Sequence, residues 1–124
     1  MPELPEVETV RKGLENLVKG KKIQAVECYW GKIIESPDVD QFKIDLMDEV
    51  IENIERRGKY LIFKLSHFDM ISHLRMEGQF EFHQSTDALM KHTHVVFKFD
   101  DLTELRYLDV RKFGRFVLVP KNTA

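Results

Sequence analysis

Proline at position 2 and glutamate at position 3, directly behind the initiator methionine, could do covalent chemistry on a carbonyl-like carbon. If Met1 is removed, Pro2 carries a free secondary amine, and a pKa of about 8 leaves part of it neutral and nucleophilic. Its adduct with an aldehyde carbon is an iminium ion, which accepts electrons during elimination on a sugar. Glu3 could act as a general acid or base. Prolines and glutamates also begin helices, so this stretch alone leaves both interpretations open.

Two other stretches combine a large apolar side chain with charged neighbours near a predicted turn. Met76 lies in SHLRMEGQF, and Phe113 lies beside Arg111 in DVRKFG. Arginine can make paired hydrogen bonds to a base edge, and an exposed phenylalanine can stack on bases or push between them. The alternatives are a core methionine and an ordinary hairpin with a half-buried Phe113.

Lys59 and the histidines are candidates for phosphate contacts. Lys59 follows RRG and precedes the apolar run YLIFKL, so it is either a charged residue at a strand edge or a lysine that faces a phosphate or a catalytic centre. His92 and His94 have no third potential ligand nearby in sequence, and the chain has a single cysteine. We therefore predict no metal site and no disulfide.

Composition restricts the class of protein. The 124 residues make one domain, and 43% hydrophobic with 32% charged residues is ordinary for a soluble protein. No apolar run approaches the roughly 20 residues of a membrane span, and no signal peptide is evident. We expect a cytoplasmic protein without membrane association.

The charges are segregated along the chain. A net charge of −2 argues against a uniformly basic nucleic-acid binder, but acidic residues crowd positions 35–55, and basic clusters occupy 19–22, 56–59 and 111–115. Such segregation can give one face a positive potential, although a single cluster is more often simply solvated.

Hydrophobic periodicity predicts the elements that hold these residues. Apolar residues at helical spacing predict an amphipathic helix that begins near Pro5 and is stopped by Gly20. Ser36-Pro37-Asp38 predicts a second, short helix through Met47. A period of two predicts the strands Ile23–Trp30, Val50–Arg57, Tyr60–Leu65, Met70–Leu74, Gln79–His83, His94–Phe99, Leu102–Leu108 and Arg115–Val119. A barrel is possible on this count, but we predict a mainly β (α+β) chain, an antiparallel sandwich of about eight strands flanked by the two helices.

Taken together, these stretches resemble one family, the formamidopyrimidine-DNA glycosylases, which remove oxidised purines from bacterial DNA. The opening PELPEVET is similar to that family's N-terminal signature, whereas the endonuclease VIII branch typically begins PEGPE. RRGKYLIF, ISHLRMEG, KHTHV and DVRKFG follow in the family's order. The resemblance covers essentially all 124 residues.

The resemblance implies catalytic roles at the N-terminus. Pro2 would attack C1′ of the damaged nucleotide and form a Schiff base, and Glu3 would donate a proton during sugar-ring opening. Glu6 would support that site, and Lys59 would assist β-elimination and contact DNA near the lesion.

The resemblance also implies DNA-binding roles. Met76, Arg111 and Phe113 would fill the gap left by the everted base. Arg111 would hydrogen-bond the orphaned cytosine, and Phe113 would insert into the base stack. His92 would contact DNA, and His73 would contact a phosphate.

The expected partner is double-stranded DNA that contains oxidised purines, bound by a monomer at the bacterial nucleoid. No cofactor is expected in this chain, because the family's zinc belongs to a C-terminal domain absent here. We expect residues 1–124 to be the N-terminal catalytic domain alone, since the sequence ends at PKNTA before the family's helix–two-turn–helix and zinc-finger modules. Such a chain should fold but bind DNA weakly, with little or no glycosylase activity.

Two other functions remain open at this point. The chain could be a non-catalytic module that binds damaged DNA, in which case Met1 would be retained. It could also be a β-sandwich interaction domain without a role in DNA binding.

Overall fold

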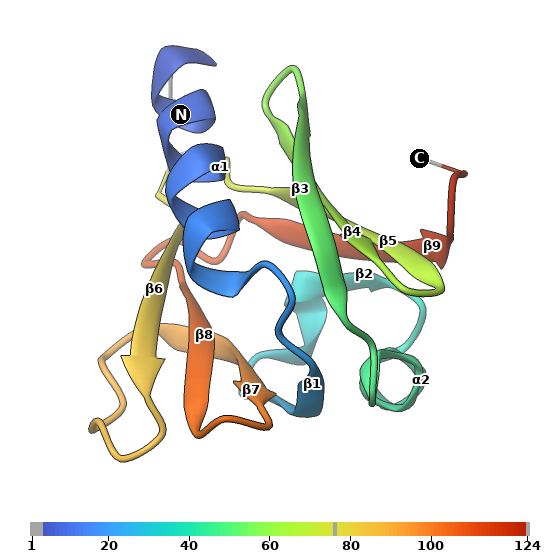
Figure 1. The fold of residues 1–124 in the computed structure, drawn as a ribbon. Helices are drawn as coiled ribbons and strands as arrows, with labels where there is room; N and C mark the ends of the chain where they lie inside the picture. The colour runs from blue at the N-terminus through green and yellow to red at the C-terminus, as the bar shows by residue number, and fades with distance from the viewer. Residues whose placement is uncertain (1–3, 76, 124) are drawn as a thin grey trace.

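The computed structural model of the protein describes residues 4–75 and 77–123. Over these ranges the chain forms two β-sheets that pack face to face, with a helix along one edge and a shorter helix below (Figure 1). In spatial order, the four-stranded sheet contains β1 (Ile23–Cys28), β7 (Thr93–Phe99), β8 (Thr103–Leu108) and β6 (Gln79–Gln84). The five-stranded sheet contains β2 (Ile34–Ser36), β9 (Arg115–Pro120), β5 (Phe68–His73), β4 (Tyr60–Leu65) and β3 (Ile51–Arg57).

The predicted sandwich with two flanking helices is confirmed, although the structure differs from the prediction in detail. The structure adds β2, which pairs in parallel with β9, so the five-stranded sheet is not wholly antiparallel. Three residues are too few for an alternating pattern to be recognised. The strand expected to reach Trp30 ends at Cys28, because the chain turns there into the short 3-10 helix η1 (Gly31–Ile33).

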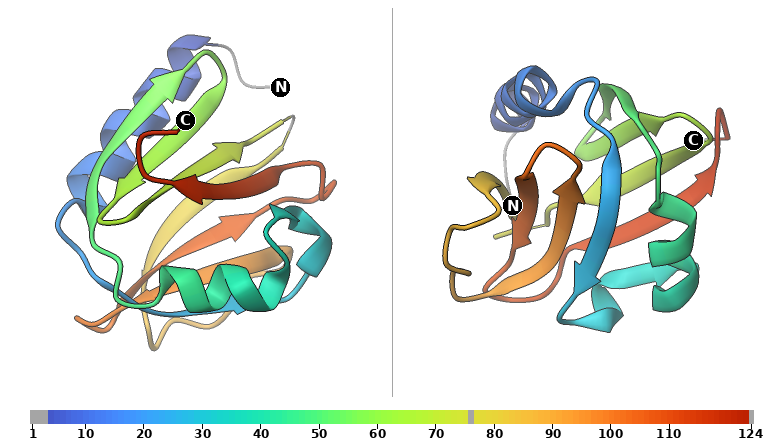
Figure 2. Two further views of the ribbon diagram at one scale, coloured as in Figure 1. Left: turned by 90° about the vertical axis from the view of Figure 1, so that its right-hand side faces the viewer. Right: turned by 60° about the horizontal axis from the view of Figure 1, so that its bottom comes forward.

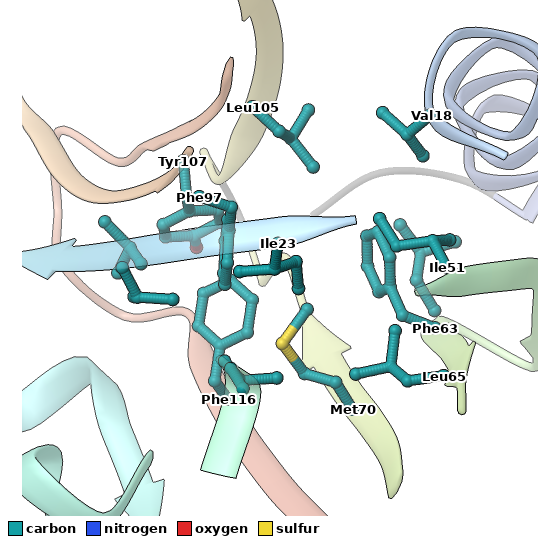
Figure 3. Packing of buried hydrophobic residues seen from close by; sticks show 14 of the residues in the cluster. Val18, Ile23, Ile51, Phe63, Leu65, Met70, Phe97, Leu105, Tyr107 and Phe116 are labelled. Carbon is teal, nitrogen blue, oxygen red and sulfur yellow. The ribbon is translucent and has the colours of Figure 1, made fainter. Parts of the chain in front are cut away.

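Aromatic rings fill the space between the sheets. The ring of Phe116 lies 5.0 Å from that of Tyr107 and 5.8 Å from that of Phe97 (Figure 3). Phe42, from the second helix, approaches Phe116 at 6.3 Å in an edge-to-face arrangement. Edge-to-face rings contribute about 0.5–1.5 kcal/mol per pair beyond their buried area. The core therefore fixes the two sheets, and the connections between their strands, relative to each other.

Helix α1 (Leu4–Val18) lies along β3, the edge strand of the five-stranded sheet. The Ile54 amide donates to Glu15 Oε2 at 2.9 Å, and the Ile54 carbonyl accepts from Arg11 Nη1 at 3.0 Å. Glu8 accepts from Arg11 through both carboxylate oxygens, each at 2.9 Å, and from Arg56 Nε at 3.1 Å. Side chains of α1 thus satisfy backbone groups that an edge strand would otherwise leave open. They also fix the start of α1 beside the end of β3.

Helix α2 (Val39–Leu46) begins as expected at Asp38, whose side chain accepts from the Gln41 amide at 2.9 Å. Its apolar face buries Phe42 and Leu46. Neither described helix is long and apolar enough to cross a membrane.

Candidate active site and nucleic-acid interface

Three connections between strands and the start of α1 meet at one end of the sandwich. Strand pairing aligns Arg57, Tyr60, His73 and Arg115 across β3, β4, β5 and β9. In the other sheet, the beginnings of β6 and β7 pair with the end of β8. The β5–β6 and β8–β9 connections therefore lie on the same side of the molecule, with the β3–β4 turn above them (Figure 2, left). The start of α1 lies at this end too, because Glu8 is bonded to Arg56 near the end of β3.

Lys59 and His73 lie close together at this end. Lys59 is half-buried in the β3–β4 turn, and His73 is buried where β5 ends. The His73 ring packs edge-on against Tyr60 at 4.6 Å, and its Nδ1 accepts the Arg75 amide proton at 3.0 Å. Burial, and then the charges of Arg75 and Lys59, lower the pKa of His73. A neutral ring that accepts at Nδ1 carries its proton on Nε2, from which it can donate to a phosphate oxygen.

Asp109 organises the β8–β9 connection. Its buried carboxylate accepts the backbone amides of Arg111 at 3.2 Å, Lys112 at 3.1 Å and Gly114 at 2.8 Å. From the other side, Arg115 donates to the carbonyl groups of Lys112 and Gly114 at 2.8 and 2.6 Å. The backbone of this connection is therefore held by side chains rather than left as an open loop.

This framework leaves two predicted site residues facing outward. Phe113 is 49% exposed, so its ring is not part of the core. Arg111 is also exposed and donates from Nε to Glu77 Oε1 at 3.0 Å, which links the β8–β9 and β5–β6 connections. Lys112 between them places its Nζ 4.1 Å from the centroid of the Trp30 ring. The backbone that Asp109 and Arg115 hold therefore exposes an apolar ring and a guanidinium group to solvent at nearby positions in the sequence.

His92 lies next to the same connection, but it does not pair with His94. The Asp109 amide donates to the His92 carbonyl at 3.1 Å, and the His92 side chain borders a pocket of about 230 Å³. His94 is buried and bonds through Nε2 to the Asp109 carbonyl at 2.6 Å. Among the described residues, no group of three or more His, Cys, Asp and Glu is placed to hold a metal ion.

Only two of the three basic clusters belong to this end. Residues 56–59 and 111–115 meet there, whereas residues 19–22 lie at the start of β3, where the Gly20 amide donates to the Ile51 carbonyl. Lys21 there forms an ion pair with Asp101. The acidic segment around α2 leads into the same far end of β3 (Figure 1). The charge segregation in the sequence is therefore also a segregation in space.

Three predicted site residues, Pro2, Glu3 and Met76, lie outside the described residues. Glu6 is exposed in the first turn of α1. The sequence did not assign roles to Tyr107, Asp109 and Glu77. An aspartate before a turn commonly accepts nearby backbone amides, so its place in DVRKFG could have indicated the role of Asp109. Nothing local in the sequence indicated Tyr107.

Comparisons with known proteins identify the class to which this arrangement belongs. The structure of the Lactococcus lactis Fpg protein in complex with DNA containing an abasic site matches with a TM-score of 0.92 and 42% identity, covering 96% of this chain and 44% of that chain. A complex of the same protein with DNA containing FAPY-dG matches with a TM-score of 0.91 and 43% identity, covering 95% and 44%. The fold is that of the N-terminal part of these DNA-bound proteins.

Sequence comparisons give the family. The model of the formamidopyrimidine-DNA glycosylase N-terminal domain matches residues 1–116. The formamidopyrimidine-DNA glycosylase of Enterococcus faecalis is 70% identical over 122 residues, covering 98% of this chain and 44% of the relative. That of Bacillus subtilis is 55% identical over 115 residues, covering 92% and 42%. The chain belongs to the formamidopyrimidine-DNA glycosylase family, and it spans less than half the length of these relatives.

Proposed function

We propose that this chain provides the catalytic N-terminal domain of a DNA glycosylase and abasic-site lyase acting on oxidised purines such as 8-oxoguanine and formamidopyrimidines. The observation that carries the proposal is the meeting of Lys59, His73, Arg111 and Phe113 with the start of α1 at one end of the sandwich. The names of the relatives, and the damaged DNA in the related complexes, support the substrate class.

The proposed chemistry begins at the N-terminus once Met1 is removed. The Pro2 nitrogen attacks C1′, the bond from C1′ to the damaged base breaks, and the base leaves with its electron pair and gains a proton. Glu3 protonates the ring oxygen of the sugar as the ring opens, which leaves an iminium ion between Pro2 and C1′. A base then removes a proton from C2′, and the 3′ phosphate leaves in a β-elimination. We assign Lys59 to this elimination and Glu6 to support of Glu3; neither metal nor organic cofactor takes part in these steps.

The proposed DNA contacts follow from the need to reach C1′. Taking a nucleotide out of the duplex costs a few kcal/mol, and side chains that refill the gap offset part of that cost. Phe113 offers an exposed ring for the stack, and Arg111 offers paired donors to the orphaned cytosine. We place Met76 in the same gap. His73, donating from Nε2, contacts a phosphate, and His92 contacts DNA.

The proposed setting is the bacterial cytoplasm, where a monomer meets the DNA of the nucleoid. Relatives from Enterococcus and Bacillus support a bacterial setting. That the 124 residues alone bind weakly, with little or no glycosylase activity, stays a prediction.

A titration followed by amide NMR tests the DNA-binding part of this proposal. ¹⁵N-labelled chain is mixed with a short duplex that carries an abasic site opposite cytosine, at concentrations that reveal even millimolar binding. We expect shifts at the amides of Lys59, His73, His92, Arg111 and Phe113, and none around residues 19–22. A matched duplex of the same length without the abasic site should produce smaller shifts. Absence of shifts, or shifts centred on the far end of β3, would contradict the proposal.

A further inference from the structure

The hydroxyl group of Tyr107 lies between the two connections that carry the proposed gap-filling residues. Tyr107 is fully buried on β8, and its ring packs against Phe80 at 5.3 Å and Phe116 at 5.0 Å. A Cβ atom at Gly78 would come within 2.3 Å of this hydroxyl, and a Cβ at Gly114 within 1.7 Å. The β5–β6 and β8–β9 connections therefore both close on one atom, and each needs a glycine at the point of contact.

The same hydroxyl donates to Asp109 Oδ2 at 2.9 Å. That oxygen also accepts the Gly114 amide, while Oδ1 accepts the amides of Arg111 and Lys112. Burial, and then the neighbouring Asp109 carboxylate, raise the pKa of Tyr107, so the hydroxyl remains a donor. Tyr107 and Asp109 thus form one buried unit that joins the core to the β5–β6 and β8–β9 connections.

We propose that Asp109 and Tyr107 are positioning residues that hold Arg111 and Phe113 ready to enter the duplex at a fixed separation from the β5–β6 connection. This inference rests on the proposed function. A connection that is already ordered loses little conformational freedom when it binds, which favours the correctly shaped partner. The recognition of the orphaned base by Arg111 then depends on Asp109, although Asp109 is itself buried.

The alternative role for this pair is purely structural, with the carboxylate serving only the stability of the fold. A structural role predicts that loss of Asp109 lowers stability but leaves the preference for the orphaned base unchanged. A positioning role predicts loss of that preference and of amide protection in the β8–β9 connection, even in variants that remain folded.

Asp109→Asn tests the proposal, because the amide keeps the shape of the side chain but turns one acceptor into a donor. Glu104→Gln is a matched control. Glu104 is also buried on β8, but it lies near the other end of the strand and pairs with Arg106. Binding is measured by fluorescence anisotropy to two duplexes with an abasic site, one opposite cytosine and one opposite adenine. Amide hydrogen exchange is measured on the free chain.

We expect the unaltered chain and Glu104→Gln to bind the duplex with cytosine opposite the abasic site more tightly than the duplex with adenine. Asp109→Asn should lose most of this preference. The amides of Arg111, Lys112 and Gly114 should exchange about tenfold faster in Asp109→Asn. Replacing one carboxylate oxygen with an amide nitrogen removes an acceptor from this set of hydrogen bonds. If Asp109→Asn fails to fold, Tyr107→Phe replaces it. This variant removes the hydroxyl that both connections pack against and that donates to Asp109 Oδ2, while it keeps the bonds of Asp109 to the backbone. It should show a smaller loss of preference and faster exchange at Gly114.

An unchanged preference in the folded variant would overturn the positioning role, whatever the exchange rates. If the unaltered chain binds neither duplex, the proposed function fails instead. The exchange rates of the free chain still decide whether Asp109 orders the connection.

Discussion

At the scale of single residues, Arg111 is already engaged before any DNA arrives. Its guanidinium group donates to Glu77 at 3.0 Å, and both side chains are exposed. An exposed pair of this kind contributes about 0–1 kcal/mol, so it is easily exchanged for another partner. In the proposed complex, a base edge would replace the carboxylate of Glu77 as the partner of Arg111, and Glu77 would repel nearby phosphates.

Glu77→Gln should therefore strengthen binding to duplex with an abasic site by about two- to fivefold, in line with the small value of an exposed ion pair. The measurement is fluorescence anisotropy at low salt. Glu52→Gln is the control, because it removes the same charge from an exposed ion pair with Lys121. Glu52 lies near the start of β3, at the far end of that strand. Equal gains in both variants, or no gain in Glu77→Gln, would mean that Glu77 does not compete locally for Arg111.

At the scale of elements, the attachment of α1 to β3 fixes the position of the start of α1. Glu8, Arg11 and Glu15 hold the helix to the edge strand through Ile54 and Arg56. The proposed nucleophile precedes this helix directly in sequence. An ionic attachment of this kind makes the position of the helix sensitive to acid.

The pH dependence follows from Glu8. Hydrogen bonds from Arg11 and then Arg56 lower the pKa of Glu8 from its ordinary value of 4.5 to about 2. Between these values the unfolded chain binds more protons than the folded one, so the stabilisation is complete above pH 4.5 and is lost as the pH falls toward 2. Thermal unfolding followed by circular dichroism should show this loss. Glu8→Gln should flatten the profile in that window, and an unaltered profile would exclude Glu8 as its source.

The elements were predictable because their signals are local. Strand Tyr60–Leu65 was placed correctly from its short apolar run, and α2 from the Asp38 cap. The β2 strand was not predictable, because it is three residues long and exists only through its pairing with β9. The hydroxyl of Tyr107 was not predictable either, since Gly78 and Gly114 meet it only when both sheets are packed.

At the scale of the whole molecule, a chain of net charge −2 presents a basic end and a more acidic end. Arg57 and Arg75 are exposed at the basic end, whereas Lys19 and Lys22 are exposed near the start of β3. The sequence revealed three basic clusters but not which of them share a face, because that depends on strand order. Of these two pairs, only Arg57 and Arg75 should contact phosphates.

Replacing Arg57 and Arg75 with glutamine should make DNA binding less dependent on salt. Each lost phosphate contact reduces the slope of log K against log salt concentration by about 0.9. Lys19 and Lys22 replaced together provide the control with the same change in net charge, and they should leave the slope unchanged. Equal effects of the two pairs would mean that net charge alone, rather than the basic end, determines the association.

The proposed chemistry depends on a covalent bond between the N-terminal amine of Pro2 and C1′, which borohydride trapping on duplex with an abasic site detects. The chain without Met1 should give a one-to-one adduct that mass spectrometry maps to Pro2. Lys59→Ala should still be trapped, whereas a chain with one extra residue before Pro2 should not, because an acylated nitrogen cannot form an iminium ion. An adduct that persists with the blocked terminus, or that maps to Lys59, would exclude Pro2 as the nucleophile.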